Sequence, residues 1–169
     1  RGSLEGATVA FIGDGNNVTN SLIEAAAKMG MTIAVGCPLG YQPDRGIVDR
    51  AREEARQTGA VIEIGADPFV AVKDADVVYT DVWISMGQER EQAKRLKILA
   101  PYQLNARLLK CAKPDALVMH CLPAHRGEEI SAEVLDGPQS VVFDQAENRL
   151  HMQKAILVRL LGKKPVRST

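Results

Sequence analysis

The chain has 169 residues, which is enough for one domain with its own hydrophobic core. Its 21 basic and 21 acidic side chains balance, so it lacks the basic excess that favours nucleic acid or an anionic membrane surface. No apolar run approaches the roughly 20 residues that a membrane-spanning helix needs. We therefore expect a globular protein with no nucleic-acid partner and no membrane partner.

Short apolar runs alternate with longer amphipathic patterns along the chain. The short runs predict strands, and the patterns with apolar residues three and four positions apart predict helices. The predicted strands are 7–12, 31–35, 60–64, 76–80, 116–120 and 140–143. The predicted helices are 19–29, 43–59, 68–73, 102–110 and 145–161. Gly30 and Gly59 are expected to end the first two helices.

This alternation predicts an α/β fold, because strands that are joined through helices form a parallel sheet with helices on both faces. Right-handed crossovers then favour a doubly wound, Rossmann-like sheet in a single domain. We expect the domain to span residues 1–162, with 163–169 as a tail. Ligands bind such sheets beyond the carboxyl ends of the strands, so the polar residues found there are site candidates.

The turn after the first predicted strand, GDGNNV at 13–18, partly matches the glycine-rich loop of dinucleotide-binding proteins. Val18 replaces the third glycine, and the second strand ends in GCP at 36–38, with no acid for a ribose hydroxyl. NAD binding is therefore disfavoured. Asn16 or Asn17 is expected to cap the following helix, and the second asparagine is well placed to donate to a carboxylate.

The segment DVWISMGQE at 81–89 follows the fourth predicted strand. Asp81 at the strand end can pair with a cation, and Gly87 gives the loop a flexible point. The charged run QEREQAKRLK at 88–97 is typical of a solvated surface helix. A long polar excursion between strands can also form a lid over a ligand.

The stretch MHCLPAHRG at 119–127 ends the fifth predicted strand. His120, Cys121 and His125 are residue types that bind zinc, but no second Cys/His pair lies near them, so we expect no metal. Two interpretations remain open. Cys121 is either a small apolar residue in a strand end or a catalytic thiol, which would need a base and a lowered pKa.

The cysteines indicate the compartment. Cys37, Cys111 and Cys121 are odd in number, widely spaced and without a CxxC motif, which argues against a disulfide framework. We therefore expect free thiols and a cytoplasmic location.

Four motifs in order, GDGNN, DVWISMG, HCLPAHRG and FDQAENR, resemble those of the ornithine carbamoyltransferases over residues 4–162. Aspartate carbamoyltransferases share the fold and a related proline turn, but the SMG element is similar to that of the ornithine enzymes. The Ser-Thr-Arg-Thr-Arg element of the family's carbamoyl-phosphate-binding domain does not occur in this sequence. The resemblance therefore implies the carboxyl-terminal, ornithine-binding half, with the amino-terminal domain absent.

The resemblance also implies residues that bind ornithine. Asn17, Ser85 and Met86 are similar to the residues that hold its α-carboxylate and α-amino ends. Asp81 matches the acid that pairs with the α-ammonium. A charge-assisted hydrogen bond of this kind is stronger than one between neutral groups.

A second set of implied residues lies nearer the chemistry. Cys121 matches the cysteine beside the side-chain amine and the carbamoyl group. Leu122 matches the residue whose carbonyl helps to bind the carbamoyl NH₂, and its bond to Pro123 is expected to be cis. Arg149 matches an arginine that reaches carbamoyl phosphate.

The activity that the resemblance implies is transfer of the carbamoyl group of carbamoyl phosphate to L-ornithine, which gives L-citrulline and phosphate in arginine metabolism. It implies no cofactor, and it implies a homotrimer with active sites between subunits. This half is expected to be inactive alone. Two alternatives stay open: a carbamoyltransferase for another amine such as putrescine, and a non-catalytic ornithine-binding module.

The last predicted helix carries more apolar surface than one sheet would cover. Its apolar residues from 146 to 161 span about half of the helix circumference, whereas an arc of about 100° suffices for packing on one neighbour. We expect a second neighbour for this helix, and self-association of the chain where that neighbour is missing.

Overall fold

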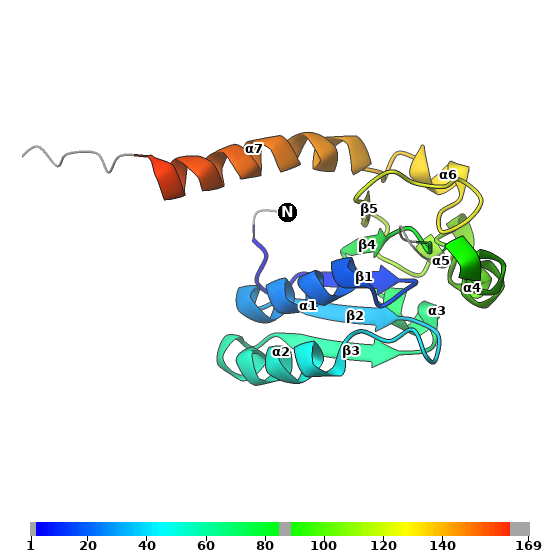
Figure 1. Ribbon diagram of the computed structural model, residues 1–169, viewed down its shortest axis with the longest axis horizontal. Helices are drawn as coiled ribbons and strands as arrows, with labels where there is room; N and C mark the ends of the chain where they lie inside the picture. The colour runs from blue at the N-terminus through cyan, green and yellow to red at the C-terminus, as the bar shows by residue number, and fades with distance from the viewer. Residues whose placement is uncertain (1–2, 85–88, 163–169) are drawn as a thin grey trace, which may run out of the picture.

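The computed structural model of the protein describes residues 3–84 and 89–162 (Figure 1). Five parallel strands form one sheet in the order β3-β2-β1-β4-β5. The strands are β1 (Thr8–Ile12), β2 (Thr32–Gly36), β3 (Val61–Gly65), β4 (Val77–Thr80) and β5 (Leu117–His120). The chain moves outward from β1 to β3 and then returns to place β4 against the other side of β1. This reversal makes the sheet doubly wound, as predicted.

Helices cover both faces of the sheet (Figure 1). The α-helices are α1 (Asn17–Met29), α2 (Arg45–Thr58), α3 (Pro68–Val72), α4 (Gln92–Leu99), α5 (Ala106–Leu109), α6 (Ala132–Leu135) and α7 (Val142–Leu161). Two 3₁₀ turns, η1 (Glu89–Glu91) and η2 (Ala100–Tyr102), flank α4. On one face α1 and α2 pack against each other and the sheet, while α3, α5 and α6 contribute to the opposite face.

The two hydrophobic cores follow the alternation of side chains along β1. Val9 and Phe11 join the core beneath α1, whereas Ala10 and Ile12 join the core on the other face. Successive side chains of a strand point to opposite faces, so a strand with helices on both sides must be apolar throughout. Burial of both faces holds the central strands rigidly in register and fixes where their carboxyl ends lie.

Local signals in the sequence set the ends of the first two helices. Gly30 and Gly59 terminate α1 and α2 with φ of 65° and 77°, in the left-handed region that glycine enters without a Cβ penalty. Both stops were predicted. At the other end of α1, the Asn16 side chain accepts hydrogen bonds from the amides of Val18 and Thr19, so Asn16 is the helix cap.

The prediction of a sixth strand at 140–143 is wrong. Ser140 makes only an isolated bridge to Val118, and α7 begins at Val142. The bridge has two backbone hydrogen bonds, from Val118 to Gln139 and from Val141 to Val118, before the chain turns into the helix. The apolar run is too short to extend a ladder, and good helix formers follow it.

The predicted helix at 102–110 is also interrupted. Tyr102 ends η2, Leu104 forms a bridge with Ile130, and α5 then begins at Ala106. Leu104 is fully buried in this extended conformation. Pairing of Leu104 with a distant segment thus overrides the local helical pattern.

Helix α7 extends away from the sheet and contacts the domain mainly at its first turns, near β5 (Figure 1). Val142 is its one buried residue among those described. The large apolar side chains exposed along it are Phe143, Leu150, Met152, Ile156, Leu157, Val158, Leu160 and Leu161. No helix within 3–84 and 89–162 is both long enough and apolar enough to cross a membrane.

Candidate functional site

Polar side chains gather where the chain reverses direction in the sheet, at the carboxyl ends of β1, β4 and β5. The turn after β1 carries Asp14 and Asn16, Asp81 follows β4, and Cys121 follows β5. Parallel pairing of β1 with β4 and of β4 with β5 brings these three ends together. Such a reversal is where open α/β sheets bind ligands.

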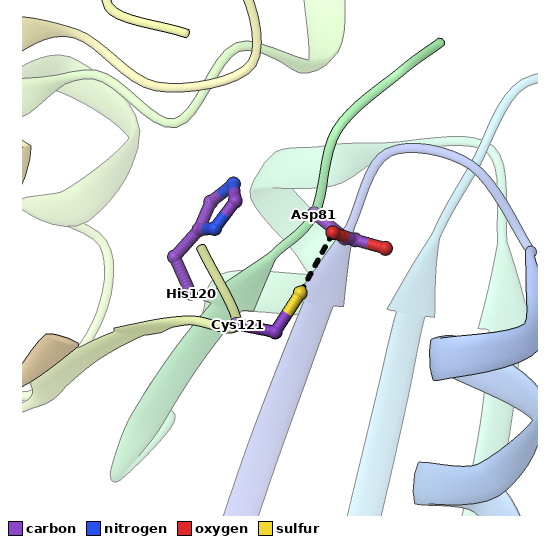
Figure 2. A group of neighbouring side chains, drawn as sticks. All are labelled: Asp81, His120 and Cys121. Carbon is purple, nitrogen blue, oxygen red and sulfur yellow. Dashed lines mark hydrogen bonds between the residues drawn. The ribbon is translucent and has the colours of Figure 1, made fainter. Parts of the chain in front are cut away.

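Asp81 is the centre of this cluster and is 6% exposed. One of its carboxylate oxygens accepts a hydrogen bond from Asn16 Nδ2 at 2.7 Å. The other accepts from Cys121 Sγ at 2.9 Å (Figure 2). A carboxylate offers about four acceptor positions, so Asp81 retains capacity to bind a cationic donor.

The two adjacent asparagines have different positions. Asn16 uses its side-chain oxygen to cap α1 and its amide nitrogen to bind Asp81. Asn17, the predicted ligand, is the first residue of α1 and is exposed, lining an open cleft with Asp14, Tyr41 and Arg95. Which of the two asparagines contacts Asp81 could not be predicted, since the cap position depends on where the helix begins.

Cys121 is a protonated thiol. Loss of hydration around the sulfur, followed by its hydrogen bond to Asp81 and the negative charge of that residue, raises the pKa of Cys121 to about 12. The residue as a whole is exposed, but its sulfur is directed at the buried carboxylate. Of the two interpretations left open by the sequence, a thiolate nucleophile is therefore not supported.

Tyr79 lies beside this thiol and is also kept neutral. Burial, with the negative charges that Cys121 and Asp81 carry when ionised, raises the pKa of Tyr79 to about 12. Its hydroxyl accepts a hydrogen bond from Gln145 Nε2 at 2.8 Å. The contact links the first turn of α7 to β4 just behind the cluster.

Arg95 holds the turns around the site in place, and the sequence analysis did not predict this role. Although it lies in the charged run expected to be solvated, it is 5% exposed and forms an ion pair with Asp14. Its Nε donates to the Trp83 carbonyl at 2.7 Å, and its guanidinium lies 4.9 Å from the centre of the Tyr41 ring. Burial raises the pKa of Asp14 above its usual value, against the opposing effect of Arg95. Arg95 thus ties α4 to the turns after β1 and β4.

The turn after β5 has the expected cis bond between Leu122 and Pro123. Leu122 has a φ of 56°, which is unusual for a leucine. Its amide donates to His120 Nδ1 at 2.9 Å, and His120 Nε2 lies 3.2 Å from Glu129 Oε1. Neither His120 nor Glu129 is exposed to solvent.

Asp81, His120 and Cys121 bring three potential metal-binding atoms within 4.8 Å of one another (Figure 2). Both ring nitrogens of His120 are already engaged, by the Leu122 amide and by Glu129. Asp81 and Cys121, which hydrogen-bond each other, are then the two candidate ligands left in this group, whereas zinc sites in proteins supply three or four. The geometry therefore favours a binding site for an organic cation over a metal centre.

The remaining predicted site residues make no described contact with the Asp81 carboxylate. Ser85 and Met86 lie outside the described residues. Arg149 is exposed on α7, and no contact found within 3–84 and 89–162 joins it to Asp81 or Cys121. Leu122 is adjacent to Cys121 in the turn.

The doubly wound sheet and the buried carboxylate at its reversal point define an α/β ligand-binding domain. The chain belongs to the aspartate/ornithine carbamoyltransferase family: residues 5–160 match the profile of the Asp/Orn binding domain. The family assignment agrees with the resemblance carried by the four motifs.

Individual relatives support this assignment. The ornithine carbamoyltransferase of Syntrophus aciditrophicus is 58% identical over 161 residues, which cover 95% of this chain and 52% of the relative. The solved ornithine carbamoyltransferase of Pyrococcus furiosus has a TM-score of 0.92 and 53% identity, with 96% of this chain and 52% of that chain covered. The corresponding structure from Gloeobacter violaceus has a TM-score of 0.87 and 51% identity, with 95% and 53% covered. The chain thus spans about half the length of the relatives it matches.

Proposed function

We propose that this chain is the ornithine-binding half of an ornithine carbamoyltransferase. The enzyme would transfer the carbamoyl group of carbamoyl phosphate to the side-chain amine of L-ornithine, giving L-citrulline and phosphate. The observation that carries the proposal is the contact between Asp81 and Cys121, which places a buried acid 2.9 Å from a neutral thiol at the reversal point of the sheet. The names of the relatives point to the same reaction.

Asp81 provides the charge that an amino acid's α-ammonium needs. Asn16 and Cys121 occupy one position on each carboxylate oxygen, and the remaining lone pairs are available to the ligand. A charge-assisted bond at this buried position would be stronger than one in open solvent. Asn17, with Ser85 and Met86, is proposed to bind the α-carboxylate and α-amino ends.

Cys121 is proposed to contact the side-chain amine as a neutral group. The attacking amine must lose its proton, although its unperturbed pKa is near that of lysine, about 10.4. A thiolate beside it would stabilise the ammonium form, whereas the raised pKa of Cys121 keeps the sulfur uncharged. The neutral thiol therefore favours the reactive amine without adding a counter-charge.

Binding of carbamoyl phosphate is proposed to need groups from both halves of the full-length protein. Leu122, through its carbonyl, and Arg149, from α7, are proposed to reach the carbamoyl and phosphate ends when the other half of the protein is present. The displaced phosphate carries charge that arginine side chains can stabilise during the reaction. We propose that residues 1–162 form the ornithine domain and 163–169 a tail, and that the full protein is a cytoplasmic homotrimer that uses no metal or cofactor.

Putrescine is a less suitable substrate for this site. It has neither an α-ammonium nor an α-carboxylate, so Asp81 and Asn17 would each forgo the bond proposed for the ligand. Removing the partner of a buried polar group costs about 1–3 kcal/mol, and more when that group is charged. The proposal therefore assigns ornithine as the acceptor amine.

The test is product formation by the full-length protein that contains this chain. With carbamoyl phosphate, we expect citrulline from L-ornithine and no carbamoyl product from putrescine at equal concentrations. The chain alone is expected to form no citrulline. Equal turnover of both amines would overturn the substrate assignment, and ornithine binding without any turnover by the full-length protein would favour a non-catalytic binding module.

A further inference from the structure

Gln145, in the first turns of α7, contacts the sheet although the proposed reaction gives it no role. Its side-chain oxygen accepts a hydrogen bond from the His120 amide at 3.1 Å, and its Nε2 donates to the Tyr79 hydroxyl at 2.8 Å. Tyr79 lies in β4, and His120 is the last residue of β5. One side chain thus joins the helix to two adjacent strands.

The two partners determine the orientation of the Gln145 amide. A backbone N–H can only donate, so the carbonyl oxygen of the side chain must face His120. The NH₂ group then faces Tyr79, whose hydroxyl oxygen accepts. If the amide were reversed, two donors would face each other at His120. Both ends of the glutamine are therefore used, and an apolar side chain of the same length could replace neither.

The strands are the rigid side of this contact. A parallel ladder joins β4 to β5, and the residues that follow the two strands are Asp81 and Cys121. On its other side β4 pairs with β1, in the centre of the sheet. A helix that is bonded to these two strands is therefore aligned on the candidate site itself.

Helix α7 has little else to hold it on the domain. Within the helix, all of which the structure describes, only Val142 and Gln145 are not exposed. Val142 is buried, but an apolar contact has no preferred direction and resists tilting only weakly. Hydrogen bonds do depend on angle, so the two bonds of Gln145 are the contacts that set the direction of the helix.

The direction of α7 matters most for Arg149. It follows Gln145 by one helical turn, which places both residues on the same side of the helix. With a rise of about 1.5 Å per residue, their backbones are about 6 Å apart along the axis, so a tilt of about 10° at Gln145 moves Arg149 by about 1 Å. A displacement of about 1 Å in a positioned group can cost about 100-fold in rate.

We propose that Gln145 is a positioning residue: its two hydrogen bonds fix the direction in which α7 leaves the sheet, and thereby the place of Arg149 relative to Cys121. The part that concerns Arg149 rests on the proposed function. The attachment of α7 to β4 and β5 is a property of this chain, and it can be measured without any substrate.

Exchange of the His120 amide hydrogen, followed by NMR, measures that attachment directly, because its acceptor is the Gln145 side chain. Gln145→Met keeps the length of the side chain and removes both hydrogen bonds. Gln145→Glu is the conservative variant, since a carboxylate can accept from the His120 amide and from the Tyr79 hydroxyl. Gln153→Met, at an exposed position of the same helix, is the matched control. Protection of the β1 amides shows that the sheet is intact.

We expect His120 amide exchange to be about 5-fold to 25-fold faster in Gln145→Met, which corresponds to losing one or two hydrogen bonds of ordinary strength. Gln145→Glu and the control should stay within about twofold of the wild type. An unchanged rate in Gln145→Met, or an equal increase in Gln145→Glu, would overturn the proposal. If Gln145→Met loses protection of β1, Tyr79→Phe decides, and an unchanged His120 exchange rate in that variant would overturn it.

Kinetics of the full-length protein separate positioning from a general structural role. We expect Gln145→Met to raise the KM for carbamoyl phosphate and to lower kcat by as much as about 100-fold, with the KM for ornithine near that of the wild type. In an Arg149→Ala background the same substitution should add little, because Gln145 acts through Arg149.

Equal losses in the two backgrounds, or an equal rise of both KM values, would show that Gln145 supports the fold without positioning Arg149. If the wild type makes no citrulline, the proposed function fails. Exchange of the His120 amide still tests the attachment of α7 in that case, so the two failures can be told apart.

Discussion

Replacing Arg95 by methionine is expected to destabilise the domain strongly, although Arg95 lies in a run of charges. The substitution keeps much of the apolar stem but leaves Asp14 without its ion-pair partner and the Trp83 carbonyl without its donor. Breaking a buried ion pair by removing one member costs about 3–5 kcal/mol. The lost bond to the carbonyl adds about 1 kcal/mol, and the contact with the Tyr41 ring about 0.5 kcal/mol.

The loss should depend on pH, because Asp14 can relieve its burial by taking up a proton. Its pKa in the folded protein is already raised, so ionising Asp14 costs folding energy as the pH rises through that pKa. Arg95 opposes this cost, and without it the pKa rises further. The loss of stability in Arg95→Met should therefore be greater near neutral pH than at a pH below the pKa of the folded Asp14.

Urea unfolding of the wild type, Arg95→Met, Asp14→Asn and the double variant measures these terms. We expect a loss of about 4.5–6.5 kcal/mol for Arg95→Met near neutral pH and a smaller loss when Asp14→Asn is already present. Lys94→Met on the exposed side of α4 is the matched control, with an expected change within about 0.5 kcal/mol. Equal losses for Lys94→Met and Arg95→Met, or a loss independent of pH, would show that no buried ion pair between Arg95 and Asp14 stabilises the domain.

Three further predictions follow from the helices and the thiol. Asn16→Ala removes the cap of α1 and should cost about 1–2 kcal/mol of stability, whereas Asn17→Ala should change stability by less than about 0.5 kcal/mol yet weaken ornithine binding. Denaturation measures the stability and calorimetry measures the binding, and the reverse pattern would contradict the assignment of the two asparagines. The isolated chain should self-associate through the exposed apolar face of α7. Replacing Ile156 and Leu160 by glutamate should therefore lower the mass measured by light scattering to that of a monomer, with an unchanged circular dichroism spectrum. A wild type that remains monomeric at high concentration would contradict this. Cys121 should react slowly with iodoacetamide at neutral pH and accelerate as the pH rises toward about 12, and fast alkylation at neutral pH would show that the thiol is not held at Asp81.

The sheet could be predicted because short stretches of sequence are enough to mark its strands and the helices between them. Each strand is a short apolar run followed by a turn residue, and Gly30 and Gly59 mark helix ends whatever the tertiary structure. The false strand at 140–143 shows the limit of that signal. A run of three apolar residues after Ser140 has no period that separates a strand from the first turn of a helix.

The candidate site was only partly predictable, because its contacts join distant segments. Arg95 resembled its exposed neighbours until its partner Asp14, 81 residues away, was seen to lie beside it. Glu129 likewise had no local mark of burial, since its contact with His120 depends on how the loop closes. The strand-end rule did mark Asp81 and Cys121 as site candidates, and the motifs that contain them carried the family resemblance.

The central claim is that Asp81 recognises the α-ammonium of ornithine, and calorimetry on the full-length protein tests it most directly. L-ornithine and 5-aminopentanoate, which lacks the α-amine, are titrated into the wild type and into Asp81→Asn. We expect the substitution to weaken ornithine binding by about 1.5–3 kcal/mol and to leave 5-aminopentanoate binding nearly unaffected. Equal losses for both ligands would show that Asp81 supports the fold of the site without reading the amine, and would contradict the account.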